Sequence, residues 1–215
     1  MSFKPNLRLH LARSILAVAA VAPLAPATAQ TIISEVFYDA LGPDSGLVFV
    51  ELYGTPGTLL DGLFLDGING TDGSVYHTVA LTGTFGSDGV FVIGDDSGNG
   101  TTQVNDFDQV GDVDFQNGPD SVVLRDSNGV LDALGYGDFS SAVFAGEGAA
   151  APDVVNGWSL ARASLLDSDD NASDFIGLSV PTPGIVPVSA VPVPPALALF
   201  LSGIAGLVGV SRRKG

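Results

Sequence analysis

Short runs rich in β-branched and aromatic residues recur along the middle of the chain, and they constrain its fold more than any other feature. The seven clearest runs occupy residues 31–38, 48–53, 63–67, 75–81, 89–95, 120–126 and 130–136. Glycine, aspartate and asparagine separate them, and no stretch between them has the 3.6-residue apolar period of an amphipathic helix. Seven or more short strands at this spacing predict an all-β fold, in the form of an antiparallel β-sandwich.

The segments between the runs refine this prediction. Asn128 and Gly129 stand between two apolar runs, a pair that favours a type I′ hairpin turn. Residues 94–119 are polar, glycine-rich and acidic, and we expect a long loop or insertion there with weak strand content. A single sandwich is therefore expected from about Ile32 to Phe175, with both ends of the chain outside it.

The charge distribution excludes one large class of partners. Lysine and arginine number eight, but three lie in the first thirteen residues and three in the last four. All 24 acidic residues fall between Glu35 and Asp174, where the cations are Arg125 and Arg162, so this middle part carries a formal charge of −22. Such a body repels nucleic acid and anionic lipid headgroups, and no nucleic-acid partner is expected.

The N-terminus has the pattern of a secretory signal peptide. A basic leader precedes a short apolar core that contains Pro23 and Pro26, and a small-x-small site ends at Ala29. The prolines and the short apolar core disfavour the alternative, an N-terminal membrane helix. Cleavage is expected between Ala29 and Gln30. The chain contains no cysteine, so the exported fold must hold without disulfides.

The C-terminus combines a proline-rich segment, an apolar stretch and a basic end. Residues 196–210 carry no charge and are rich in Leu, Ala, Gly and Val. As a helix they would reach about 22 Å against a hydrocarbon core of about 30 Å, which is slightly short unless the basic end extends it. Because positive flanks stay in the cytoplasm, this helix would place the acidic body outside the membrane.

This tail resembles a PEP-CTERM sorting signal, most closely of the VPLPA variety. The resemblance rests on a proline motif with Pro192 and Pro194, then the apolar segment, then a basic end with Arg212 and Arg213. It implies recognition by an exosortase-type transpeptidase, which would cut near the proline motif and pass the body to the cell surface or extracellular matrix. The chain departs from the family pattern at Val193 and Pro195.

The body resembles a lamin tail domain in three stretches that keep the family's order. They are ISEVFYDALGPDSGLVFVELYGTPGTLLDGLFLDG (33–67), GPDSVVLRDSNGVLDALGYG (118–137) and GWSLARASLLDSDDNASDFIGLSVPTPG (157–184). Glu35, Glu51 and Arg162 match family positions, whereas Gly54 and Ala161 depart from them. The resemblance implies an immunoglobulin-like antiparallel β-sandwich that serves as an accessory or interaction module.

These observations predict four parts of the chain. Residues 1–29 form the signal peptide, 30–184 the lamin-tail-like sandwich, 185–195 a proline-rich linker with the sorting motif, and 196–215 a separate apolar transmembrane helix with a basic end. The mature protein would be exported to the cell surface or extracellular matrix, after transient anchoring in the inner membrane by that helix.

Catalytic chemistry has few candidate residues in the exported part. His77 is its one histidine, and it lies in a strand-like run, which favours a structural role in a sheet. No Gly-x-Ser-x-Gly nucleophile motif precedes a helix. Glu35 and Glu51, on adjacent predicted strands, could act as a glycosidase-like carboxylate pair. The favoured interpretation is structural: edge or rim residues neutralised by Arg162 or by backbone donors.

No cofactor is expected, and calcium is the best candidate among chemical ligands. Hard cations take oxygen ligands, and residues 167–174 begin like an EF-hand loop, although Ala172 and Leu178 depart from its later positions. The candidate ligands are Asp167, Asp169, Asn171 and Asp174. The favoured interpretation is that these acids, and a second concentration over residues 95–114, serve solubility.

The sequence thus favours an exported, non-catalytic surface or matrix protein whose sandwich binds a polymer such as extracellular polysaccharide, a surface protein or calcium. The alternative function is that of a secreted hydrolase that uses carboxylates.

Overall fold

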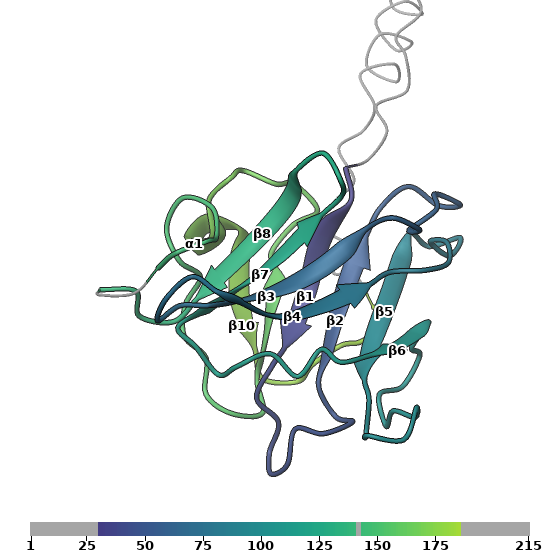
Figure 1. Ribbon diagram of the computed structural model, residues 1–215, viewed down its shortest axis with the longest axis horizontal. Coiled ribbons are helices and arrows are strands. Elements are labelled where there is room, and N and C mark those ends of the chain that lie inside the picture. The colour runs from purple at the N-terminus through teal and green to yellow at the C-terminus, as the bar shows by residue number, and fades with distance from the viewer. Residues whose placement is uncertain (1–29, 141–142, 186–215) are drawn as a thin grey trace, which may run out of the picture.

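A computed structural model describes residues 30–140 and 143–185, which form an all-β body of two facing sheets (Figure 1). The larger sheet has the strand order β10 (Phe175–Leu178), β9 (Ser159–Arg162), β1 (Ile32–Phe37), β2 (Phe49–Tyr53), β5 (Val90–Asp95) and β6 (Gln109–Gly111). The smaller sheet has the order β4 (Val75–Ala80), β3 (Phe64–Asn69), β7 (Asp120–Arg125) and β8 (Val130–Tyr136). All seven runs that the sequence predicted as strands are strands, which confirms the all-β, two-sheet prediction.

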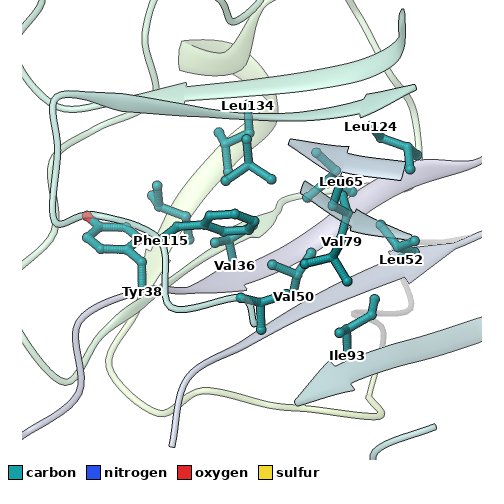
Figure 2. Packing of buried hydrophobic residues seen from close by; sticks show 14 of the residues in the cluster. Val36, Tyr38, Val50, Leu52, Leu65, Val79, Ile93, Phe115, Leu124 and Leu134 are labelled. Atoms are coloured by element: carbon teal, nitrogen blue, oxygen red, sulfur yellow. The ribbon is translucent and has the colours of Figure 1, made fainter. Parts of the chain in front are cut away.

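Apolar side chains from both sheets meet in one core (Figure 2). Val36, Val50 and Ile93 come from the larger sheet, and Leu65 and Leu134 face them from the smaller one. Alternate residues of each strand point to opposite faces, so the same strands present a second set of side chains to the outside of the sandwich. Burial of the inner set supplies the main driving force for folding.

The outer face of the larger sheet is also covered. Phe49, Val90, Val92 and Val104 form a second buried apolar cluster there, with Phe37 and Tyr53 packed against it. A bulge in β1 helps to fill this face, because the register with β2 shifts between Ile33 and Glu35. The extra residue turns Ser34 and Glu35 both to the outer side while Ile33 and Val36 stay in the core.

Two local predictions need correction. The β7–β8 hairpin exists, but its turn is not type I′, because neither Asn128 nor Gly129 has a positive φ. Instead Oδ1 of Asp126 accepts hydrogen bonds from the amides of both residues, and this side-chain cap sets the turn. The segment 94–119 has the weak strand content expected of it, namely the three-residue β6, but β6 pairs parallel to β5, which departs from the predicted antiparallel pattern.

The structure also contains elements that the seven runs did not include. β10 closes one edge of the larger sheet, and α1 (Asn171–Asp174) is a single helical turn that leads directly into it. Among the described residues, no helix has the length and apolar character to cross a membrane. The predicted signal peptide and C-terminal helix lie outside the described residues.

Candidate functional site

A buried arginine joins the two sheets. Arg162 of β9 donates from one terminal nitrogen to Oδ1 of Asp132 on β8, at 2.7 Å, and from Nε to the carbonyl oxygen of Ile33. The other oxygen of Asp132 accepts the Ile33 amide. Arg162 is 1% exposed, and its guanidinium lies over the Phe175 ring. Burial alone would lower the pKa of Arg162, but the surrounding carboxylates outweigh it and hold the group charged.

The loop that carries α1 completes the surroundings of this arginine. Asp174 accepts a 2.8 Å hydrogen bond from Arg162 and two more from the amide and hydroxyl of Ser168. Burial opposes ionisation of Asp174, but these hydrogen bonds and the arginine charge keep its pKa below the ordinary value. Asp167 also contacts Arg162, at 3.4 Å. The loop is thus fixed to the sandwich through its own acidic residues.

Three carboxylates gather beside Arg162 in an arrangement that could hold a metal ion. Each of Asp132, Glu147 and Asp167 offers an oxygen, and these atoms lie within 4.8 Å of one another. We call this group the acidic triad. Oε2 of Glu147 is buried and has no hydrogen-bond partner, and burial followed by repulsion from Asp132 raises the pKa of Glu147 to about 8. A hard cation with oxygen ligands suits such a set.

The residues predicted as calcium ligands have different surroundings. Of the four, Asp167 belongs to the acidic triad, whereas Asp169 is exposed on the loop. Asn171 is fully buried, and its side chain accepts from the amides of Gly135 and Glu147 and donates to the carbonyl oxygen of Ala133. These bonds complete the free edge of β8, while Asp174 is bonded to Arg162 and Ser168.

Sequence reasoning did not find the other two members of the triad. Asp132 carried a signal, because a single acid inside an otherwise apolar run of residues 130–136 suggests a buried partner. Glu147 lies between two glycines in an irregular segment and carried none. The two residues are distant from Asp167 in sequence, so loop spacing alone could not bring them together.

The second set of buried carboxylates comes from the predicted glutamate pair. Glu35 of β1 and Glu51 of β2 face each other directly in the register of these two strands, and both are 0% exposed. They are not edge or rim residues, because β1 and β2 lie inside the larger sheet. Arg162 bonds elsewhere, and the donors on this pair are hydroxyl and backbone groups. Backbone donors do bond to the two glutamates, as the structural interpretation predicted, whereas Arg162 does not.

The donors come largely from one short segment, residues 181–184, which we call the strap. The amide and hydroxyl of Thr182 donate to the two oxygens of Glu35, at 3.0 and 2.7 Å. The amide of Gly184 donates to Oε2 of Glu51 at 2.8 Å. Ser159 and Ser34 supply further hydroxyl bonds, to Glu35 and Glu51 respectively. The paired glutamates are thus closed off from solvent.

The sequence of the strap explains its shape. The Ile185 amide bonds to the Thr182 carbonyl oxygen, and Gly184 has a φ of +81°. A proline at the second position and a glycine with positive φ at the third are the requirements of a type II turn, and Pro183 and Gly184 meet them. This turn points its amides at the glutamates, while the strap prolines line a hollow with Phe37, Phe49 and Val104.

Two further charged contacts lie on the smaller sheet. Arg125 of β7 pairs with Asp66 of β3 and covers the Phe64 ring, with about a third of its side chain exposed. His77 of β4 contacts Asp112 at 3.2 Å and is 35% exposed. His77 is therefore a sheet residue paired with an acid.

No family model, curated protein or solved structure matches this chain.

Proposed function

We propose that this chain is an exported, non-catalytic surface or matrix protein whose immunoglobulin-like sandwich is a binding or scaffolding module. The observation that carries the proposal is the burial of Glu35, Glu51 and Arg162, the three residues that the lamin-tail resemblance singles out. Each is at most 1% exposed and is bonded within the body. Residues used in this way hold the sandwich together and leave its surface for partners.

The same observation weighs against the hydrolase alternative. A glycosidase pair needs both carboxylates open to a substrate and set about 5–9 Å apart around the bond that is cut. Here the strap covers both glutamates. Glu35→Gln and Glu51→Gln variants should therefore show no loss of any hydrolytic activity, and turnover of a polysaccharide that disappears in either variant would overturn the proposal.

Export and sorting are proposed from the two ends of the sequence. The leader would direct the chain out of the cytoplasm, and the tail with Pro192, Pro194, Arg212 and Arg213 would hold it for an exosortase-type transpeptidase. The mature partner would be an extracellular polymer or surface protein that tolerates a strongly acidic body, since the charge of −22 repels polyanions.

Intact-mass measurement of protein extracted from the cell surface tests the sorting step. The expected mass lacks residues 1–29 and residues 196–215. Replacement of Arg212 and Arg213 by Glu should impair retention and processing, whereas replacement by Lys keeps the positive end and should leave both unchanged. A surface form that keeps the full tail would contradict cleavage and favour a permanent anchor.

Calcium binding is a second candidate function, which we propose on the strength of the acidic triad. A ligand that binds the folded state at a hundred times its Kd adds about 2.7 kcal/mol to the free energy of unfolding. Millimolar calcium should raise the melting temperature more than magnesium at equal ionic strength. Asp167→Asn should abolish this difference, and Asp169→Asn, on the same loop but outside the triad, should keep it. Equal shifts with both ions would leave screening of the acidic surface as the explanation.

A further inference from the structure

The strap covers Glu35 and Glu51, two adjacent buried carboxylates whose simultaneous ionisation would destabilise the fold. Glu35 and Glu51 are directly opposite partners on neighbouring strands, where like charges destabilise a sheet. Both are fully buried, and burial favours the neutral form of a carboxyl group. Their hydrogen-bond partners are the strap amides and the hydroxyls of Ser34, Ser159 and Thr182, which are uncharged.

The other titratable groups around the strap are also acidic. Asp88 from the segment between β4 and β5, and Asp106 and Asp108 from the segment before β6, line one hollow with Gly184. Glu35 faces Glu51 from β1. The described residues contain two arginines, and both are paired with other carboxylates. Every charged group that faces Glu51 therefore opposes its ionisation.

We propose that the strap is a latch whose closure takes up a proton, so that it closes firmly in weak acid and loosens as the pH rises. In the closed state one proton on the glutamate pair removes the repulsion between two buried charges. In the open state the strap no longer covers Glu51, and its carboxylate ionises in water.

The size of the effect follows from linkage. Burial, with repulsion from Glu35 and Asp88, raises the pKa of Glu51 to about 7. A glutamate in water has an ordinary pKa of 4.5, and we assign this value to Glu51 when the strap is open. The closing equilibrium should then weaken about tenfold between pH 6 and pH 8. The pH range of the latch is therefore centred near neutrality.

Hydrogen exchange at the Thr182 and Gly184 amides tests the latch in the full chain in detergent micelles. After correction for the intrinsic exchange rate, protection at pH 6 should be about ten times that at pH 8. Glu51→Gln should remove this dependence. Glu147→Gln is the matched control, because it removes another buried glutamate with a raised pKa but leaves the strap untouched, and the tenfold change should remain.

A second, less disruptive variant keeps the proposal testable if Glu51→Gln does not fold. Ser34→Ala removes a donor that stabilises the Glu51 anion, so the loss of strap protection should move to higher pH. Protection of β3 and β7 amides reports whether each variant is folded. Equal strap protection at the two pH values in the unmodified chain, or an unchanged pH dependence in both Glu51→Gln and Ser34→Ala, would overturn the proposal.

Discussion

At the scale of the residue, Arg162 makes more hydrogen bonds and ion pairs than any other side chain discussed above. One guanidinium bonds to strands of both sheets and to the loop that carries α1. Its charge is what makes several nearby carboxylates tolerable in the interior, because buried charges must be paired and hydrogen-bonded. The arginine thus serves as the common counter-ion for Asp132, Asp167 and Asp174.

Removal of this counter-ion should be costly. Arg162→Ala leaves Asp132 and Asp174 buried without their partner, and we expect a loss of about 3–5 kcal/mol in the free energy of unfolding, measured by urea denaturation. Arg125→Ala is the matched control: about a third of the Arg125 side chain is exposed, and its buried partner Asp66 keeps the hydrogen bond from Thr78, so the loss should be smaller than for Arg162→Ala. Equal losses in the two variants would contradict the central role of Arg162.

Single residues were the least predictable part of the candidate site from sequence. Glu35, Glu51 and Arg162 could be singled out through a resemblance, but the partner of each depends on which strands become neighbours. Arg162 was expected near the paired glutamates and instead bonds to Asp132. The β1 bulge that turns Ser34 and Glu35 to the same side has no signature in a pattern of alternating residues.

At the scale of the element, strands were predictable because their residues bury one or both faces and leave a clear β-type pattern. Seven runs gave seven strands, whereas β6, with three residues, is too short to show a pattern within an acidic segment. The Asn128 and Gly129 pair indicated the hairpin but not its turn type, since the Asp126 side chain bonds to the same amides that a tighter turn would orient. A competing side-chain bond decided the geometry.

The strap gives a prediction at this scale. Gly184→Ala places a side chain at a φ of +81° and within 3.1 Å of the Asp106 Cβ atom, so the turn should open and expose the Thr182 amide to exchange. We expect a stability loss of about 1–2 kcal/mol, and the Thr182 amide should lose protection disproportionately. Gly57→Ala is the control, because Gly57 has a φ of +77° but open space around it. It should lose comparable stability and keep the strap protected.

At the scale of the whole molecule, the acidic composition should be visible as a pH dependence of stability. Glu51 titrates near pH 7 in the folded protein and near 4.5 in the unfolded chain. Between these values the folded state holds more protons, so the free energy of unfolding falls as the pH rises. Glu147, with a pKa of about 8, acts in the same direction.

The expected outcome is a protein that melts at a higher temperature at pH 5.5 than at pH 8. Glu51 alone should contribute about 2 kcal/mol to this difference. Groups with lowered pKa values, such as Asp174, act in the opposite sense, but they lose their contribution only below about pH 4. Thermal unfolding of Glu51→Gln should show a flatter pH profile, and an unchanged profile would contradict the assignment.

The strap also determines which contacts would break first if mechanical force were applied to the C-terminal end of the body. In a body tethered through its C-terminal tail, a pull enters the fold at Ile185 and meets the three strap bonds to Glu35 and Glu51 before any strand. Release of residues 179–185 would lengthen the tether by about 25 Å while the sandwich stays intact. The next element in the line of force is β10, a short edge strand of the larger sheet. Under such force the strap would detach before β10, and re-forming the turn at residues 182–185 would reverse this first step.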